Sequence, residues 1–371
     1  MNSKKRNFSY IMRSTFVGIS IISAFFLPVV LPAQQNPTLF TCFGPSSGSS
    51  VNLWEIKDRE VKDRSKPVPV HLKWTVGPQC PGNAVFDVYL SKTEHFTEND
   101  LISTDTSSTD VSVTNLEIGT LYFWQVVTRE KGNVLYRGPI WRFQTSPVPP
   151  RWIDINGVTN VRDMGGWITQ DGYKIKQGLL YRGAAMNKEG EMFITPTGID
   201  TFVRRLHIKT DLDFRGAYEK KVVPAIDTTT VKWIKISISP YADIVSSGET
   251  GKKAYRKVFH QLAEPGNYPI YMHCQIGADR MGTVAFLVGA LLNMRNEDLF
   301  RNYDLTSFSL SGIRDHNSEM FQGLLKVVSA YGKENDSLQR KVYYYLLDIG
   351  VTGEEIQSIY YILTGAKFIL H

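Results

Sequence analysis

The segment of residues 268–292 constrains the fold of this chain more than any other part of it. Its opening run, Tyr268-Pro-Ile-Tyr-Met-His273, has the apolar character of a buried strand, and the run from Thr283 to Leu292 has that of a buried helix. A strand that passes through a short loop into a helix is the building unit of α/β folds, in which helices cover a central sheet. We therefore expect this segment to lie at the centre of an α/β domain.

The loop of residues 274–282 has the features of an anion-binding site. A loop between a strand and a helix aims its backbone N–H groups, and the positive end of the helix, at one point. Gly277 and Gly282 permit a tight path and a close approach of the backbone to a ligand. Arg280 follows Cys274 by six positions, and its planar fork can bind two phosphate oxygens. The expected phosphate-binding residues are Gln275, Ile276, Gly277, Ala278, Asp279 and Arg280.

Cys274 is the expected nucleophile of this loop, because the same positive surroundings favour its thiolate. A thiolate beside a bound phosphate can attack phosphorus in line and form a cysteinyl-phosphate, which water then hydrolyses. The leaving oxygen needs a proton, so an aspartic or glutamic acid should lie nearby. No ligands stand at metal-binding spacing, and neither a metal nor another cofactor is expected. The alternative interpretation is a buried structural cysteine in an ordinary strand-to-helix turn.

Residues 40–146 have a different pattern, with short apolar or alternating runs separated by Gly and Pro turns and no helical period. The clearest expected strands are 70–74, 84–90 and 121–127. This pattern predicts a small β-sandwich, and residues 116–126 with Trp141–Thr145 resemble the last strands of a fibronectin type III module.

Residues 147–150 form an expected stiff linker, and the α/β catalytic domain then occupies residues 151–371. Within it, strands are expected over 208–214 and 233–239, and helices over 252–262, 281–292 and 353–363.

The N-terminus predicts a secretory signal peptide over residues 1–33. Lys4, Lys5, Arg6 and Arg13 precede or open a mostly apolar run, and Leu31-Pro-Ala33 offers a cleavage point. An uncleaved membrane anchor is the alternative, since residues 10–31 nearly suffice to span a bilayer. We expect an exported protein, periplasmic or secreted, that contacts a membrane only through this segment if it is uncleaved. Export would permit a disulfide between Cys42 and Cys80, which leaves Cys274 unpaired.

The chain resembles the protein tyrosine phosphatase superfamily, and above all its bacterial tyrosine and lipid phosphatases, whose loop reads His-Cys-x-x-Gly-Lys-Asp-Arg-Thr-Gly. The resemblance covers most of residues 151–364. Beyond the loop it rests on Gly157–Gly166 for the opening Asn-x-Arg-Asp-x-Gly-Gly element, Gly178–Gly183 for Gly-x-Leu-Tyr-Arg-Ser, Asp211–Arg215 with Glu219 for Asp-Leu-Arg-Ser-x-x-Glu, and Tyr303–Thr306 and Leu346–Glu355 for the closing helices.

This resemblance implies that Cys274 is the nucleophile and that Arg280 binds phosphate. It makes Asp279 a candidate general acid, although a solvated or helix-capping carboxylate is the alternative. Asp243 is the rival, because it precedes the cysteine by about as much as the mobile acid loop of other branches. An ordinary loop aspartate is the alternative there.

The resemblance also brings supporting residues to the site. Asp213 and Arg215 match the Asp-Leu-Arg element, as groups that face the site or as a structural ion pair. Hydrogen bonds from His273 are expected to orient the loop. The residues expected to brace the entrance of the domain, or to be purely structural, are Asn160, Arg162 and Asp163.

Two positions depart from the family pattern. Ala278 replaces the loop Lys, so a preference for inositol lipids does not follow from the resemblance. Met281 replaces a Ser or Thr whose hydroxyl stabilises the departing thiolate, which predicts slow breakdown of the phosphoenzyme. Thr283 is the candidate substitute for that hydroxyl.

The sequence therefore predicts an exported phosphomonoesterase for phosphorylated protein, inositol phosphate or glycan. A catalytically weakened module that binds phosphorylated ligands is the alternative, and a rhodanese-type sulfurtransferase would not explain the match from Gly157 to Glu355.

The formal net charge of +6 is spread along the chain without the dense basic stripe of a nucleic-acid-binding protein. A basic cluster could line a mouth for polyanions or be merely solvated; its members are Lys220, Lys221, Lys252, Lys253 and Arg256.

Overall fold

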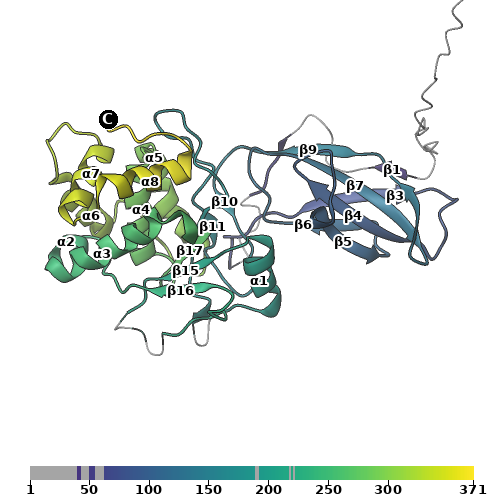
Figure 1. Ribbon diagram of the computed structural model, residues 1–371, viewed down its shortest axis with the longest axis horizontal. Coiled ribbons are helices and arrows are strands. Elements are labelled where there is room, and N and C mark those ends of the chain that lie inside the picture. The colour runs from purple at the N-terminus through teal and green to yellow at the C-terminus, as the bar shows by residue number, and fades with distance from the viewer. Residues whose placement is uncertain (1–39, 43–49, 55–61, 189–191, 217–218, 220–221) are drawn as a thin grey trace, which may run out of the picture. The chain divides into compact units, whose positions relative to one another are not determined.

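The computed structural model describes residues 40–42, 50–54, 62–188, 192–216, 219 and 222–371 (Figure 1). The predicted signal peptide lies outside these residues, as does the side chain of Cys42. Cys80 carries a free, half-buried thiol whose Sγ lies 3.8 Å from the carbonyl oxygen of Pro81. Among the helices so described, none has the length and apolarity needed to cross a membrane.

The N-terminal part consists of β-sheets. One sheet has the strand order β1-β3-β6 and the other the order β2-β9-β7-β4-β5, with β8 paired to β7. The strands are β1 (Phe40–Cys42), β2 (Ser50–Val51), β3 (Val70–Val76), β4 (Val85–Ser91), β5 (Leu101–Thr106), β6 (Asp110–Val113), β7 (Leu121–Glu130), β8 (Asn133–Arg137) and β9 (Trp141–Thr145).

Residues of both sheets share one buried cluster, in which Trp74 of β3 and Phe86 of β4 lie edge to face. Alternate residues of β3 are buried, the period expected of a strand with one face on a core. The β-rich character predicted for this part is thus confirmed. Its identity as a fibronectin type III module, and the domain boundaries at 40–146 and 147–150, stay predictions.

The C-terminal part is built on a mixed sheet of strand order β10-β11-β12-β17-β15-β16. β12, β17, β15 and β16 run parallel, whereas β10 and β11 are antiparallel to their neighbours. The strands are β10 (Arg151–Trp152), β11 (Arg162–Asp163), β12 (Leu180–Gly183), β15 (Thr210–Asp213), β16 (Lys232–Lys235) and β17 (Ile270–His273), and a separate ribbon pairs β13 (Asn187–Lys188) with β14 (Met192–Phe193).

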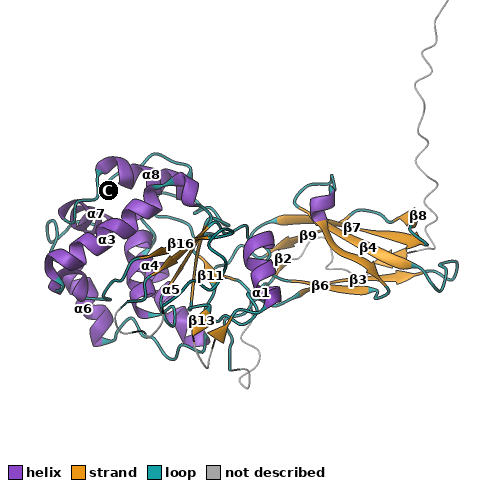
Figure 2. Cartoon of the chain, turned by 60° about the horizontal axis from the view of Figure 1, so that its bottom comes forward, coloured by secondary structure: helices purple, strands orange, loops and turns teal. Residues whose placement is uncertain are grey.

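Helices cover this sheet (Figure 2). Ile270 and Met272 of β17 join the cluster formed with the helices, whereas Tyr271 between them joins the cluster on the opposite face, so the strand is buried on both sides. The helices are α1 (Pro196–Asp200), α2 (Asp243–Ser246), α3 (Gly248–Ala263), α4 (Asp279–Leu291), α5 (Asn296–Asp304), α6 (Glu319–Ser329), α7 (Leu338–Asp348) and α8 (Gly353–Thr364).

The predicted α/β architecture of this part is confirmed. Helix α4 is buried along its length from Met281 onwards, because its apolar run has no polar face to turn to solvent. The expected strands at 208–214 and 233–239 are shorter in the structure, as β15 and β16, and the three expected helices are α3, α4 and α8.

The parallel strands bring their carboxyl ends to one edge of the sheet. His273, the last residue of β17, is level with Gly183 of β12 on one side and with Asp213 of β15 on the other. Residues that follow these strands therefore meet at this edge, which is where α/β sheets form their ligand sites.

Candidate active site

The loop after β17 presents a row of backbone N–H groups next to Cys274. The Cys274 side chain is buried, and α4 starts at Asp279. From Gln275 to Met281, no backbone N–H donates a hydrogen bond to any residue that the structure describes. Unpaired N–H groups at the start of a buried helix are an anion-binding arrangement.

Gly277 is required by this path. Its φ is +70°, and a Cβ there would lie 2.4 Å from the carbonyl oxygen of Gly183, which is backbone and cannot rotate away. The loop therefore packs directly on the end of β12.

Side chains from three distant segments hold the carbonyl groups of the loop. The Asn160 amide nitrogen donates to the oxygens of Ile276, at 3.2 Å, and Gly277, at 3.1 Å. Arg182 Nη2 donates to the Gly277 oxygen at 2.9 Å, and Ser311 Oγ donates to the Ile276 oxygen at 2.6 Å. Because C=O and N–H point opposite ways in a trans peptide, these bonds fix the directions of the next two N–H groups.

The sequence prediction had not singled out two of these anchors. Arg182 lies within the matched Gly178–Gly183 element, which was the available signal. Ser311 lies in a loop without a recognisable pattern, so no signal could have identified it.

His273 lies between the loop and two carboxylates. Its Nδ1 donates to the carbonyl oxygen of Cys274 at 3.1 Å, and its Nε2 is 3.0 Å from Asp211 Oδ1 and 3.8 Å from Asp213 Oδ2. Burial by itself would lower the pKa of His273, but the charges of Asp213 and Asp211 outweigh it and raise this pKa to about 9. A protonated ring has an N–H on each nitrogen, so Nδ1 can donate to the Cys274 oxygen while Nε2 interacts with the two carboxylates through its charge, without a hydrogen bond among the described residues.

Asp213 and Arg215 bind one another. Arg215 Nη2 lies 2.7 Å from Asp213 Oδ2 and Nε lies 3.0 Å from Oδ1, with both side chains buried. Burial would raise the pKa of Asp213, but His273 and Arg215 lower it. The structural ion pair that the sequence left open for these residues is thus present, and its Asp213 carboxylate also lies 3.8 Å from His273 Nε2.

Arg280 forms an ion pair with Glu219, and its Nη1 lies 3.4 Å from the Phe214 carbonyl oxygen. Burial would lower the pKa of Arg280, but Glu219 and the charge on Cys274 raise it. Arg182, which is fully buried, has its pKa lowered to about 10 by burial in spite of the opposing charge on Cys274. Arg182 and Arg280 are thus the two guanidinium groups whose charges interact with that of Cys274.

The Asp279 carboxylate is engaged on both oxygens. Arg314 Nε donates to its Oδ1 at 2.9 Å and Nη2 to its Oδ2 at 3.1 Å, while the Tyr241 hydroxyl donates to Oδ1 at 2.5 Å. Arg314 was not identified from the sequence, since it lies in an irregular loop 35 residues away. Among the described residues these bonds use two acceptor sites of Oδ1 and one of Oδ2, so the remaining site for a proton is on Oδ2.

Asp243 is less constrained. It is the first residue of α2, is exposed, and accepts a hydrogen bond from Ser246 Oγ at 2.7 Å. Asp243 and Asp279 line the same hollow of about 930 Å³, together with Tyr241, Ile313 and Arg314. Asp279, which starts α4, is the member of the phosphate loop that lines this hollow, and Asp243 lies on the same hollow.

Of the two departures from the family pattern, Ala278 directly precedes α4 and Met281 lies in its first turn. The Met281 side chain is fully buried in the core. Thr283 Oγ1 donates to the Asp279 carbonyl oxygen at 3.0 Å and accepts from the Tyr241 N–H at 2.9 Å. With these partners, its hydroxyl supports α4 and Tyr241 rather than taking the place of the missing hydroxyl.

Arg162 and Asp163 form β11, and both are buried. Arg162 is buried, donates to Asn160 Oδ1 and to the Asn302 carbonyl oxygen at 2.7 Å, and its pKa is lowered by burial and by Arg182. Asp163 pairs with Arg151 at 2.7 Å; burial raises its pKa in spite of that partner. Arg162 therefore holds Asn160, whereas Asp163 braces the entrance of the domain.

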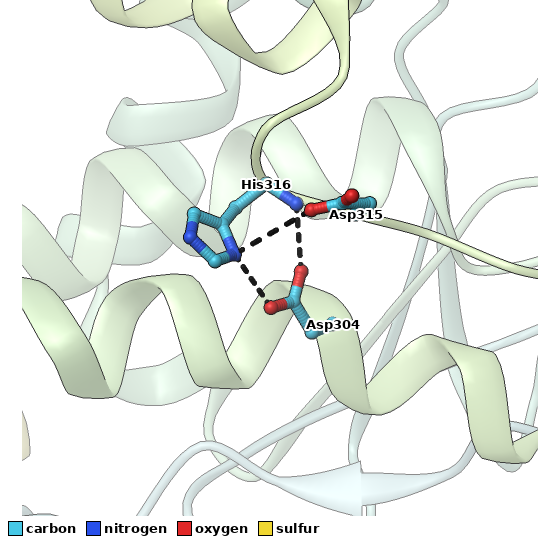
Figure 3. A group of neighbouring side chains, drawn as sticks. All are labelled: Asp304, Asp315 and His316. Carbon is cyan, nitrogen blue, oxygen red and sulfur yellow. Dashed lines mark hydrogen bonds and ion pairs between the residues drawn. The ribbon is translucent and has the colours of Figure 1, made fainter.

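Asp304, Asp315 and His316 form a group with the spacing of a metal site (Figure 3). His316 Nδ1 is 2.6 Å from Asp304 Oδ2, and the His316 N–H donates to the other oxygen at 2.8 Å. The imidazole also stacks on Phe300. These bonds anchor the loop that carries Ser311 and Arg314 to the end of α5.

Two members of the expected basic cluster, Lys252 and Arg256, bind other parts of the protein. Lys252 forms an ion pair with Asp348 at 2.7 Å, and Arg256 donates to the Gly350 carbonyl oxygen at 2.6 Å. These two cations thus bind the turn after α7. Lys220 and Lys221 lie outside the described residues.

Comparison with known proteins gives one family. A sequence model described as "Tyrosine phosphatase family" matches residues 153–359, which is more than half of the chain. Among solved structures, the core catalytic domain of the S. cerevisiae PP-IP phosphatase SIW14, in complex with citrate, is similar with a TM-score of 0.29 and 17% identity over 42% of this chain and 86% of that chain. No curated protein matches the chain by sequence.

Proposed function

Because the chain belongs to the tyrosine phosphatase family, we propose that it is a phosphomonoesterase that works through a cysteinyl-phosphate on Cys274. The observation that carries this proposal is the row of N–H groups from Gln275 to Met281, which donate to no residue in the described part of the chain, beside a buried thiol and Arg280. Three non-bridging phosphate oxygens need many donors at one place, and this loop supplies them.

The reaction has two steps. The loop N–H groups and Arg280 hold the phosphoryl oxygens, and Cys274 Sγ attacks phosphorus as the bond to the leaving oxygen breaks. The leaving oxygen takes a proton from an acid. The deprotonated acid then takes a proton from water as the water oxygen attacks the phosphorus of the cysteinyl-phosphate, the S–P bond breaks, and inorganic phosphate and the thiolate are released.

Asp279 is our first candidate for the acid, because it belongs to the loop and lines the hollow beside it. In this proposal the proton is carried by Asp279 Oδ2, which accepts one hydrogen bond, from Arg314, among the described residues. Asp243 lines the same hollow, has one side-chain hydrogen-bond partner among the described residues, and is the alternative acid.

The hollow favours substrates with one phosphate group. Its charged residues are Asp243, Asp279, Asp315 and Glu319 against Arg314 and Lys326. This excess of carboxylates opposes a second phosphate there. We therefore favour phosphotyrosine or another simple phosphoester over a polyphosphorylated inositol. Export, which the N-terminal segment predicts, would place that substrate outside the cytoplasm.

The decisive experiment measures phosphate release from p-nitrophenyl phosphate by residues 34–371 with EDTA and a reductant present. Cys274→Ser, which keeps size but removes the thiolate, is the matched control. Activity that survives EDTA and disappears in Cys274→Ser supports the proposal. A folded wild type without activity would reject it and leave the phospho-ligand-binding module in its place.

A further inference from the structure

We propose that Ser65, in the N-terminal β-rich part, is a positioning residue for the phosphate loop; this inference rests on the proposed function. Ser65 lies between β2 and β3, outside the residues matched by the family. It is nevertheless 1% exposed, because residues of the C-terminal part cover it. A small polar side chain buried this deeply needs hydrogen-bond partners.

Those partners connect Ser65 to Asn160. The Asn160 N–H donates to Ser65 Oγ at 3.0 Å, and this oxygen lies 3.4 Å from Thr159 Oγ1. Ser65 Oγ in turn donates to Asp63 Oδ1 at 2.5 Å, which leaves its lone pairs directed at Asn160 and Thr159. Without Ser65 Oγ, the buried Asn160 N–H would lose its acceptor.

The backbone conformation of Asn160 directs its side chain at the loop. Its φ is +61°, in the left-handed region that Asn adopts more readily than most other non-glycine residues. From this conformation its side chain reaches the Ile276 and Gly277 carbonyl oxygens. A shift of the peptide before Asn160 would therefore turn its amide away from the loop.

The segment around Ser65 is fixed independently on both sides. Lys66 Nζ donates to Asp154 Oδ1 at 2.9 Å and to the Val158 carbonyl oxygen at 2.7 Å. On the other side, the Arg64 N–H donates to the Phe308 carbonyl oxygen at 2.7 Å.

A second route reaches the same carbonyl group. Thr159 Oγ1, beside Ser65, accepts from the Leu310 N–H at 3.2 Å, and the next residue, Ser311, donates to the Ile276 oxygen. The contacts of Ser65 thus lead to both side chains that hold Ile276. These bonds set the direction of the Gly277 N–H, which is one of the proposed phosphate donors.

The test compares four proteins of residues 34–371: wild type, Ser65→Ala, Asn160→Ala and the double variant. We expect Ser65→Ala to lower kcat/KM for p-nitrophenyl phosphate by about tenfold, the effect of one lost buried hydrogen bond. The affinity for inorganic phosphate, measured by calorimetry, should fall in parallel. In the Asn160→Ala background, Ser65→Ala should change either quantity by less than about twofold, because the pathway is already broken.

Lys66→Met is the control for loss of a contact between the two parts. It removes the bonds to Asp154 and Val158 but no bond to Asn160, so it should lower the melting temperature without changing phosphate affinity. Ser65→Cys, nearly isosteric with a weaker acceptor, serves if Ser65→Ala does not fold.

Equal losses in Lys66→Met and Ser65→Ala, or independent losses that multiply in the double variant, would overturn the positioning role. The affinity for inorganic phosphate shows whether a failure concerns this inference or the proposed function. A wild type that binds phosphate without turnover rejects the proposed reaction, and the Ser65 comparison still stands on affinity. A wild type that binds no phosphate overturns both.

Discussion

Replacing Gly277 by alanine tests the geometry of the phosphate loop most directly. The new Cβ would lie 2.4 Å from the Gly183 carbonyl oxygen, whereas such contacts essentially never fall below 3.0 Å, so the two segments must separate by at least about 0.6 Å. A φ of +70° adds about 1–2 kcal/mol of strain for a residue with a Cβ. Because a misplacement of about 1 Å can cost about 100-fold in rate, we expect kcat/KM to fall by about 10- to 100-fold.

Two other glycines separate the contributions. Gly172 has a φ of +82° but nothing within 4 Å of its would-be Cβ, so Gly172→Ala should lower stability through strain alone and leave activity unchanged. Gly266 has neither feature, so Gly266→Ala should change neither quantity. Urea unfolding measures the stability and p-nitrophenyl phosphate hydrolysis the activity. A Gly277→Ala protein with wild-type activity would refute the packing of the loop on β12.

Three further predictions concern individual side chains. If Asp279 is the acid, Asp279→Asn should lower kcat at least about 100-fold for phenyl phosphate but much less for p-nitrophenyl phosphate, whose leaving group needs no proton; the same pattern in Asp243→Asn would assign the acid there instead. Met281→Thr should speed breakdown of the phosphoenzyme, seen as a smaller pre-steady-state burst with a higher steady-state rate, and an unchanged burst would contradict the role given to the missing hydroxyl. The pKa of His273 is raised to about 9, so the stability that its charge contributes is complete below about pH 6.5 and is lost as the pH rises through 9. Urea unfolding from pH 6 to 10 should show this loss in the wild type but not in His273→Gln, and parallel curves would reject it.

The local chemistry of the loop could be predicted from the sequence. An apolar strand, glycines and an apolar helix follow one another directly along the chain, so short-range preferences suffice to place Cys274 and Arg280 in one loop. The position of Asp213 at the carboxyl end of a strand could also be predicted, because the expected strand of residues 208–214 ends there. The β-rich character of the N-terminal part could be predicted from its short apolar or alternating runs, which Gly and Pro turns separate.

What the sequence could not provide are the partners that come from far along the chain. Arg182, Ser311 and Arg314 contact the loop only because the sheet order and the anchored loop after α5 bring them there. The engagement of Asp279 by Arg314 was hidden for the same reason.

The sequence by itself thus determined which groups we propose as reacting groups, Cys274 and Arg280, since they are neighbours in one strand–loop–helix unit. The tertiary structure alone decided what holds them, because each supporting bond joins residues whose proximity no local pattern encodes. Ser65 and Asn160 are the clearest case: 95 residues separate them, and their hydrogen bond exists only through the packing of one part of the chain on the other.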